Sequence, residues 1–486
     1  MKKILLCLCL AVALSFSAAA QKRVVLNIER TVQMATDSSL QVRRYRSDFA
    51  ASRFRYLSWE ASRRPQILFS STPVMYEQYM TRRYLSNENV DVYRQQKLFY
   101  TEVGLTFSQT LEPLGGQFYG ATQLGYLRAF GDTRQQQWMT VPVSLGYRQD
   151  LLFYNPLKWD RRIEPLKLTR AEKELAYHIE STSVEAVEKF FALALAQDQL
   201  QMAEEYLASC DTIYAIARQC YKISSISKAE LSILELASTN ARTTLSNARI
   251  THSRTVRDLA TLLGMAPGTD IELVIPSVAR NLHVNLEEAL VQARENNPAY
   301  VQARQLTLEA RRDADKARVE KNFTISLDAS VGLNQVANQF AAAYQHPPVK
   351  SMANISFSIP LLDWGNRKNL WMAAVSALEA AEQAEEDTAR NTERDVTQAV
   401  EEFNERQEIV EIASQALAIA EEAYTQSLQL FIRGQSSAYD LSLAQSHWQN
   451  ARSNQIASLQ NYWLAYYRLR RLTLYDFQRR SVICYE

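Results

Sequence analysis

Two long stretches of this chain contain neither proline nor glycine, the residues that most often end a helix. They run from Leu166 to Leu263 and from Asn366 to Arg433. A helix of a globular protein usually has about 11 to 12 residues. Stretches of this length therefore predict long helices or coiled coils rather than compact domains.

Apolar residues recur every seven positions in both stretches. In the second stretch these are Val396, Phe403, Val410, Leu417, Tyr424 and Phe431. In the first stretch the same register holds Ala186, Leu193, Leu200, Leu207, Tyr214 and Tyr221. A sustained seven-residue repeat favours helices that wind around each other. An amphipathic helix in the core of a large globular domain is the alternative.

The chain contains an internal duplication. The segment LNIERTVQMATDSSLQ from Leu26 resembles VNLEEALVQARENNPA from Val284 at an offset of 258 residues, and each copy is expected to open one helix of about 35 residues. Further along, Leu151-Leu152 matches Leu361-Leu362 at an offset of 210. The first copy must therefore carry an insertion of 48 residues between Pro65 and Asp150.

Each long helix is expected to end at a turn into a second helix. Ser227-Lys228-Ala229-Glu230 and Ser437-Ala438-Tyr439-Asp440 both fit a capping box, in which the serine and the acid satisfy free backbone N–H groups at a helix start. The helices before these turns are predicted from near Trp159 to Ser224 and from near Arg367 to Arg433. The two copies thus form helical hairpins of equal length.

Segments with a period of two residues precede the long helices. FTISLDASVGLN and NISFSIP alternate apolar and polar residues in the second copy, and TEVGLTFSQ and VPVSLGYRQ do so in the first. Such alternation is typical of transmembrane barrel strands, although an exposed soluble sheet looks similar. The insertion is expected to add a hairpin, which gives four strands in the first copy and two in the second. Because small single-chain barrels start at about eight strands, several copies of the chain must share one barrel.

The start of the chain, MKKILLCLCLAVALSFSAAAQ, reads as a secretory signal peptide cleaved near Ala20. A net charge of +1 favours no nucleic-acid partner. The five histidines form no H-E-x-x-H pair, and neither a G-x-S-x-G elbow nor a phosphate-binding glycine loop occurs. We therefore expect no enzymatic activity, no cofactor and no metal.

The motif G-x-x-S-x-x-D-L-x-x-A-Q, from Gly434 to Gln445, is followed by a helix rich in Ala, Asn and Tyr. Together with SIPLLDWGNRK, from Ser358 to Lys368, and the duplicated helix-strand-strand-helix pattern, it resembles the TolC-like outer-membrane efflux protein family. The resemblance implies a homotrimer with an outer-membrane barrel that continues into an α-helical periplasmic tunnel. It also implies docking on a periplasmic adaptor protein and on an inner-membrane transporter of the RND or ABC type.

The fold class expected is mainly α with a membrane β-barrel portion. After a signal peptide (1–20), the first repeat is expected to contain a tunnel helix (21–64), barrel strands with the extra hairpin (65–155) and a long coiled-coil hairpin (156–263). An equatorial connection (264–283) leads to the second repeat, with a tunnel helix (284–321), barrel strands (322–362) and a long coiled-coil hairpin (363–475), and a C-terminal tail (476–486) follows.

In the family that the chain resembles, acidic residues near the G-x-x-S-x-x-D motif narrow the mouth of the tunnel. Asp440 matches the first acidic position, whereas the second is Leu443, which would make an apolar constriction. Asp440 acting only as a helix cap is the alternative. The expected adaptor contacts are the residues of the two turns, which by default are solvated: Ser224, Ser227, Glu230, Arg433, Gly434, Gln435 and Ser437.

The function expected is therefore an outer-membrane channel of a tripartite efflux or export system. A duct for type I polypeptide secretion is an alternative with the same architecture. A soluble periplasmic coiled-coil scaffold is an alternative of a different class, and it leaves the alternating strands without a purpose.

Overall fold

The computed structural model describes residues 23–85, 90–130, 135–222, 227–266, 268–276, 282–433, 435–436 and 438–485. The expected signal peptide lies outside these residues. The chain divides into two compact units. Unit 1 comprises Met1–Phe49, Ala171–Pro298 and Ala389–Glu486, and unit 2 comprises Ala50–Arg170 and Ala299–Thr388.

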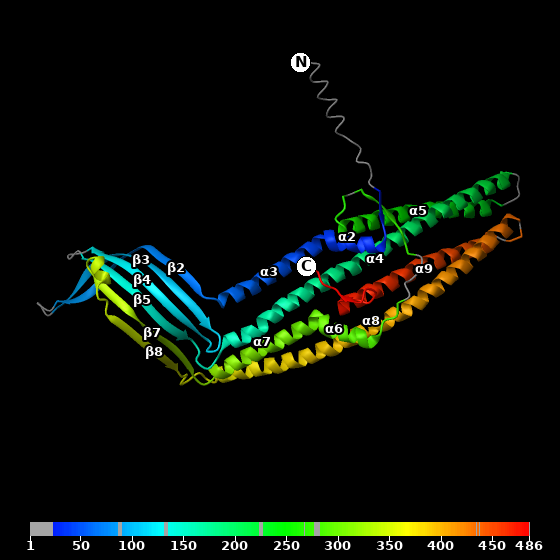
Figure 1. Cartoon of the computed structure of the whole chain (residues 1–486). Helices are drawn as coiled ribbons and strands as arrows, with labels where there is room; N and C mark the ends of the chain where they lie inside the picture. The colour runs from blue at the N-terminus through cyan, green and yellow to red at the C-terminus, as the bar shows by residue number, and fades with distance from the viewer. Residues whose placement is uncertain are drawn as a thin grey trace, which may run out of the picture. The chain divides into compact units, whose positions relative to one another are not determined.

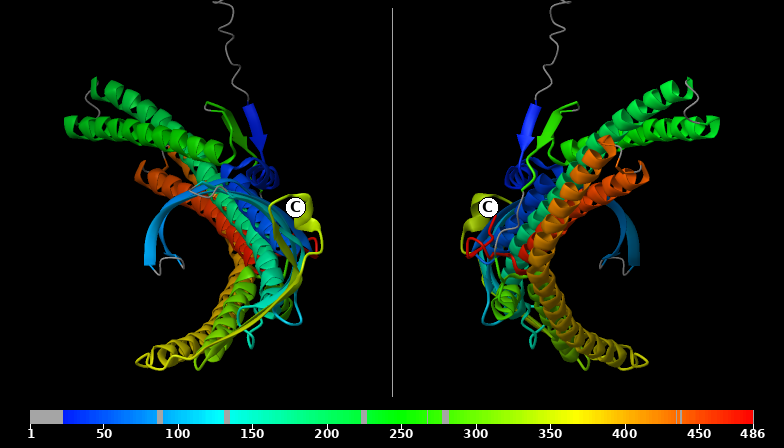
Figure 2. Two further views of the ribbon diagram at one scale, coloured as in Figure 1. Left: turned by 90° about the vertical axis from the view of Figure 1, so that its left-hand side faces the viewer. Right: turned by 90° about the vertical axis from the view of Figure 1, so that its right-hand side faces the viewer.

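Unit 2 contains one antiparallel sheet of six strands, in the order β2-β3-β4-β5-β7-β8 (Figure 1). The strands are β2 (Gln66–Leu85), β3 (Val90–Leu111), β4 (Gly116–Phe130), β5 (Gln135–Gln149), β7 (Thr324–Ala337) and β8 (Val349–Ser358). A 3₁₀ turn, η1 (Ala341–Tyr344), lies between the last two. Figure 2 shows these strands bent into an arc. Both copies of the duplication therefore contribute to one sheet, whose edges are β2 and β8.

Long helices make up most of the described chain. They are α2 (Ile28–Ser38), α3 (Leu40–Ser62), α4 (Pro156–Lys222), α5 (Lys228–Leu262), α6 (Leu286–Asn296), α7 (Pro298–Glu320), α8 (Asn366–Ile432) and α9 (Ala438–Thr473). In unit 1, α5 runs back along α4 and α9 runs back along α8, as Figure 1 shows. Among the described residues, no helix is both long enough and apolar enough to cross a bilayer.

The helix boundaries repeat with the two offsets found in the sequence. The larger offset relates both ends of α2 and α3 to both ends of α6 and α7. The smaller offset relates both ends of α4 to those of α8, and the start of α5 to the start of α9. The two long helices have 67 residues each, so the prediction of equal length is confirmed. The inserted residues form an additional hairpin within the same sheet.

The prediction of one continuous helix at the start of each copy, within 21–64 and 284–321, is wrong. Ser39 separates α2 from α3, and Asn297 separates α6 from α7. Both residues have extended backbone angles, and each donates its N–H to the carbonyl four residues earlier. In the second copy Pro298 explains the break, because proline favours the first position of a new helix and disfavours helical geometry in the residue before it.

Unit 1 also contains two pairs of short strands that the sequence did not indicate. The strand β1 (Arg23–Leu26) pairs in parallel with β6 (Asp270–Leu273), and β9 (Tyr475–Asp476) pairs with β10 (Ser481–Val482). Four or fewer residues carry too little periodicity to be recognised as a strand. The residues expected as an equatorial connection and as a C-terminal tail are therefore partly strands.

The core of unit 1 follows the predicted seven-residue register over part of its length. Val396, Phe403 and Val410 of α8 are buried, and Phe403 packs on Tyr462 of α9 with ring centroids 5.3 Å apart. Further toward the turn, Leu417 and Tyr424 are only half-buried. The α8–α9 hairpin is thus packed more tightly from Val396 to Val410 than toward its turn.

An ion cluster anchors the C-terminal strands in unit 1. The guanidinium of Arg470 in α9 lies 3.0 Å from Glu180 Oε1 and 3.4 Å from Asp476 Oδ2. Glu180 is fully buried, and its carboxylate also accepts a hydrogen bond of 2.7 Å from the Tyr485 hydroxyl. Burial and the nearby Glu180 raise the pKa of Tyr485, so this hydroxyl stays protonated and remains a donor.

The register between β5 and β7 depends on Gly332, which permits a test of the sheet. A Cβ at this position would lie 2.6 Å from the Val143 carbonyl oxygen and 2.8 Å from Ser144 Cα, both of them backbone atoms. We expect Gly332→Ala to cost about 1 to 3 kcal/mol of stability, measured as a lower unfolding temperature by circular dichroism in detergent. The control is Gly104→Ala, because its Cβ would meet nothing closer than 3.4 Å. Equal losses in the two variants would contradict this assignment.

Candidate functional site

The sheet of unit 2 has one apolar face. Cross-strand pairs place Phe69 opposite Leu105, Leu145 opposite Val331 and Leu327 opposite Ile355. Large apolar residues on this face are each at least 37% exposed: Ile67, Phe69, Val103, Leu105, Phe107, Val143, Leu145, Val331, Ile355 and Phe357. Exposing so extensive an apolar surface to water is unfavourable, so such a surface marks a contact with lipid or with another protein.

The opposite face of the sheet carries a polar network. The carboxylate of Asp328 in β7 accepts hydrogen bonds from Tyr119 of β4 at 2.9 Å and from Arg148 of β5 at 2.9 Å. Farther along, Gln123 of β4 donates a hydrogen bond to Glu102 of β3. A sheet with one apolar face and one polar face is typical of strands that separate lipid from a water-filled lumen.

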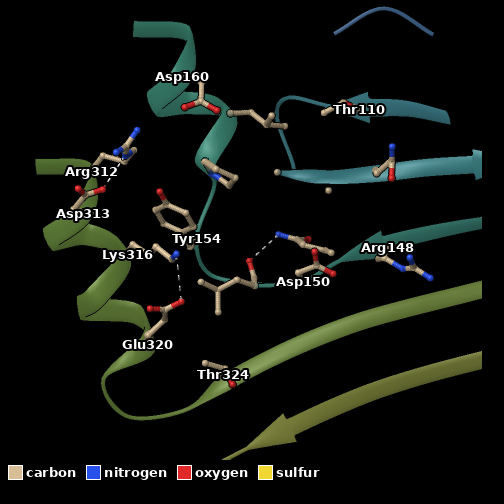
Figure 3. Close-up of a pocket in the computed structure, with 17 residues that line it drawn as sticks. Thr110, Arg148, Asp150, Tyr154, Asp160, Arg312, Asp313, Lys316, Glu320 and Thr324 are labelled. Carbon is tan, nitrogen blue, oxygen red and sulfur yellow. Dashed lines mark hydrogen bonds and ion pairs between the residues drawn. The ribbon is translucent and has the colours of Figure 1, made fainter. Parts of the chain in front are cut away.

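A charged cleft of about 740 Å³ lies where β5 leads into α4, beside α7 (Figure 3). Arg312 and Lys316 project from α7 toward Tyr154. Burial raises the pKa of the Asp160 carboxyl, although the nearby Arg312 opposes that rise. The cleft contains cations and carboxylates in similar number, and within the described residues no cluster of side chains suits a metal ion. The cleft lies where the strands of unit 2 meet its helices.

The two helix turns contain the residues predicted as sites. Ser224, Gly434 and Ser437 lie outside the described residues, and Glu230 is described only through its backbone in α5. Ser227 is exposed, and its carbonyl accepts from Leu231 N at 3.2 Å as α5 begins. Gln435 donates its N–H to the Leu430 carbonyl at 2.9 Å and so closes the end of α8.

Asp440 and Leu443 both lie near the start of α9 and are exposed. The Asp440 carboxylate accepts a hydrogen bond of 3.4 Å from the Ser436 hydroxyl. Asp440 stands in the first turn of α9, where a carboxylate interacts favourably with the helix dipole. Arg433, at the end of α8, is exposed as well.

A buried ion pair joins the helical hairpin of one copy to that of the other. In unit 1, Asp198 of α4 is 5% exposed in its side chain and pairs with Arg452 of α9. Arg452 also donates to Gln201 Oε1 at 3.2 Å and lies over the ring of Trp448. Trp448 in turn stacks on Tyr424 of α8, with centroids 5.2 Å apart. Arg452 and Trp448 of α9 thereby link this helix to α4 and to α8, respectively.

Sequence reasoning missed this pair. The acid stands within FFALALAQDQLQ, where a charge interrupts an otherwise apolar helix face. A charged residue in such a position is seldom buried without a partner, and that rule would have identified Asp198. It would not have identified Arg452, because the relative rotation of the two hairpins is not encoded in either helix alone.

Comparison with known proteins agrees with this geometry. Residues 289–473 match the family model described as outer membrane efflux protein. No curated protein sequence matches the chain.

Several solved structures have a similar fold. The Campylobacter jejuni CmeC outer membrane channel is 12% identical, with a TM-score of 0.67 over 93% of this chain and 88% of that chain. A membrane protein from Pseudomonas aeruginosa is 16% identical, with a TM-score of 0.65 over 92% of this chain and 90% of that chain. The outer membrane protein VceC from Vibrio cholerae is 13% identical, with a TM-score of 0.64 over 92% of this chain and 95% of that chain.

The helical hairpins and the two-faced sheet agree with the match to the outer membrane efflux protein model, which describes a family of channels and not of enzymes. Residues 289–473 thus match the outer membrane efflux proteins, and the chain as a whole has the fold of the solved outer-membrane channels. Channels of this family are trimeric components of efflux systems.

The contribution of Arg452 to stability is testable. In Arg452→Met, Asp198 stays buried without its cation, so we expect a loss on the order of 3 kcal/mol at neutral pH. Burial raises the pKa of Asp198, and Arg452 opposes that rise. Removing the arginine raises this pKa further. A carboxyl whose pKa is higher in the folded than in the unfolded protein destabilises the folded state when it is ionised, and this cost disappears below the unfolded pKa of about 3.9. The deficit in unfolding temperature should therefore shrink as the pH falls.

A matched control is Asp198→Asn combined with Arg452→Met, which removes both charges. It should recover part of the lost stability. A deficit in Arg452→Met that does not depend on pH would contradict the role assigned to Asp198.

Proposed function

We propose that three copies of this chain form one channel, with a shared barrel in the outer membrane and a helical tunnel in the periplasm. The observation that supports this proposal is the open six-stranded sheet with one apolar face. Its edge strands β2 and β8 have no partner strand on their outer side among the described residues. In lipid, each backbone group left unpaired costs several kcal/mol. Association of copies edge to edge removes that cost.

The strand number sets the width of the proposed barrel. Three copies with six strands each give 18 strands in one ring. Barrels of about 16 to 18 strands enclose an aqueous channel. Without the inserted hairpin, each copy would supply four strands and the ring only 12. The polar network of Glu102, Tyr119, Arg148 and Asp328 would then face water in the lumen.

The helical hairpins carry the proposed contact with partners. Each copy presents two turns, after α4 and after α8, at corresponding positions of the duplication. We propose that Ser224, Ser227, Glu230, Arg433, Gly434, Gln435 and Ser437 contact a periplasmic adaptor protein, which connects the channel to an inner-membrane RND or ABC transporter. The exposed side chains of Ser227, Arg433 and Gln435 support this proposal.

Two other functions share some of these features. A duct for polypeptide secretion would have the same sheet and hairpins, but the family match favours efflux. A soluble coiled-coil scaffold would explain the hairpins, but it would leave the exposed apolar face of the sheet in water. The efflux channel therefore accounts for more of the observations.

The trimer is tested by the native mass of the protein extracted in detergent from the outer-membrane fraction. We expect a mass equal to three copies of the chain after the detergent contribution is subtracted. A monomer or dimer, or recovery of the protein in the soluble periplasmic fraction, would contradict the shared barrel.

We propose further that Asp440 and Leu443 narrow the mouth of the tunnel. If Asp440 faces the pore, its carboxylate attracts cations there, and Asp440→Asn should raise single-channel conductance or weaken block by divalent cations. Ser436→Ala is the control, since it removes the hydrogen bond to Asp440 but keeps the charge. Planar-bilayer recordings in which Asp440→Asn changes neither quantity would reject the pore role and leave helix capping.

A further inference from the structure

The apolar face of the sheet in unit 2 is interrupted by cations toward one end. In β3, Lys97 lies an even number of residues from Leu105 and Phe107, so the alternation of side chains places it on their face. Arg128 of β4 lies opposite Phe99 of β3 and shares this face. A cation on a surface that faces lipid is costly and is found with a partner.

No carboxylate of the described residues forms an ion pair with Lys97 or Arg128. On the same face of the described strands, the other charged residues are Arg82 and Asp91, and these two pair with each other. Glu102, which belongs to the polar network, lies on the opposite face. Two positive charges on the apolar face are therefore not compensated by the described residues.

The two cations lie close enough to share one ligand. Lys97 is opposite Phe130, and Arg128 is two residues before Phe130 on the same strand. Residues in such a diagonal relation are about 7 to 8 Å apart. The Arg128 guanidinium lies over the Phe130 ring, 5.1 Å from its centroid, and is thereby directed toward the position opposite Lys97. One anionic group between the two side chains can contact both.

The side chains around the cations suit an amphipathic ligand. Gln78 and Gln136 lie opposite the two cations and offer amide donors. The next aromatic pair toward the helices is Tyr126 with Trp138, whose ring centroids are 4.8 Å apart. Tyrosine and tryptophan are enriched where a membrane meets water. An anionic head group could contact the cations and amides while an apolar body rests on the rings.

The length of the strands agrees with a membrane surface at this position. Phe107 lies opposite Ile67 near the start of β2, at the end of the sheet that follows α3. Lys97 is ten residues farther along β3, which is about 33 Å at about 3.3 Å per residue. With a strand tilt of about 40°, this is about 25 Å along the membrane normal, the height of the apolar band of a barrel. Lys97 and Arg128 therefore lie at the border of that band farthest from the helices.

We propose that Lys97 and Arg128 bind the phosphate group of a membrane lipid at this border. This inference rests on the barrel proposed above, to which it adds a ligand and the two residues that hold it. A phosphate monoester carries a charge of about −1.5 to −2 at pH 7 and so matches two cations, whereas a phosphodiester can carry only one negative charge. The ligand is therefore a lipid whose head group contains a phosphate monoester.

Other occupants fit this position less well. The strands β3 and β4 are interior strands of the sheet, so a neighbouring copy that joins an edge strand does not cover their apolar face. Solvation by water alone would require both side chains to extend beyond the apolar band, but the Arg128 guanidinium lies over the Phe130 ring. A free phosphate ion would use the cations without the aromatic rings, and competition separates it from a lipid.

Lipid binding to the full-length protein, delipidated in non-ionic detergent, tests the proposal. The probe is diphosphoryl lipid A, a glycolipid with phosphate monoesters, and bound lipid is measured by native mass spectrometry. Lys97→Gln with Arg128→Gln should weaken binding about tenfold or more, because two charge-assisted contacts with the phosphate are lost. Lys97→Arg with Arg128→Lys keeps both charges and should bind within about threefold of the unchanged protein.

A matched control removes two cations outside the proposed site. Arg82 already pairs with Asp91, and Lys350 lies opposite Gly332 of β7, on the polar face. Arg82→Gln with Lys350→Gln changes the net charge by the same amount, so general attraction of an anion falls equally, and binding should stay within about twofold. Equal losses in the two double variants would overturn the site.

Three further probes identify the kind of ligand. Phosphatidylglycerol, which is a phosphodiester, should bind more weakly than lipid A, and phosphatidylcholine, which has no net charge, should bind equally weakly to all variants. Excess inorganic phosphate should not displace lipid A. Displacement would assign the cations to free phosphate, and equal binding of lipid A and phosphatidylcholine would overturn the role of the phosphate group.

The native mass separates failure of this inference from failure of the proposed channel. If the protein is a trimer from the outer-membrane fraction, but the variant without both cations binds lipid A as the unchanged protein does, the inference alone is wrong. A soluble monomer would overturn the barrel and the lipid site together. If the double variant does not fold, the single variants Lys97→Gln and Arg128→Gln decide: each should bind lipid A more weakly, and unaltered binding by both would overturn the site.

Discussion

Hydrogen bonding of backbone groups at the two edges of one sheet is the constraint on which this structure depends. In the hydrocarbon core of a membrane, no water is present to form hydrogen bonds with the unpaired N–H and C=O groups of an edge strand. The sheet of unit 2 ends in β2 on one side and in β8 on the other. Pairing of these edges between copies, as proposed, satisfies the backbone and encloses the polar face in one step. In that arrangement, assembly of the copies and insertion of the sheet into the membrane would be parts of the same process.

The two copies of the duplication share geometry but differ in chemistry. Contacts within the chain contain charge, such as Asp198 with Arg452 and the cluster of Glu180, Arg470 and Asp476 in unit 1. Some counterpart positions are small instead: Lys167 of α4, which pairs with Glu309, corresponds to Ala377 of α8. Charged groups are costly to bury when a partner is absent. Within one chain both members of an ion pair are always present, whereas a charge at a contact between copies stays unpaired until the copies assemble.

The sequence predicted the parts of the fold that depend on long periodic patterns. The helices α4 and α8 follow from the absence of glycine and proline, and β7 follows from strict alternation. The strand β2 was not recognised, because Ile67, Leu68 and Phe69 interrupt the alternation and Pro73 lies within it. In the structure, the register between β2 and β3 shifts between Thr72 and Met75, so the proline occupies an irregularity that tolerates a missing N–H.

The candidate site was predictable only in part. The motif from Gly434 to Gln445 located Asp440 and Leu443 near the start of α9. It gave no sign of Arg452, whose partner lies in the other copy of the duplication and depends on how two hairpins pack. Likewise, no local pattern distinguishes Tyr154, which is 7% exposed, from its counterpart Trp364 in the second copy, which is 89% exposed. Their different exposure follows from which helix lies beside each segment, and that is a property of the tertiary structure.

The inserted hairpin has a consequence for how such a channel can change its bore. In a ring of antiparallel strands, neighbours must run in opposite directions, so each copy must contribute an even number. One additional strand would leave both edges of the sheet running the same way and would place the following helix on the wrong side of the membrane. Two strands, here within the 48 additional residues of the first copy, are the smallest addition that keeps the ring closed and the helices unchanged. Pore diameter in this architecture can therefore grow only in discrete steps, independently of the length of the helices beneath it.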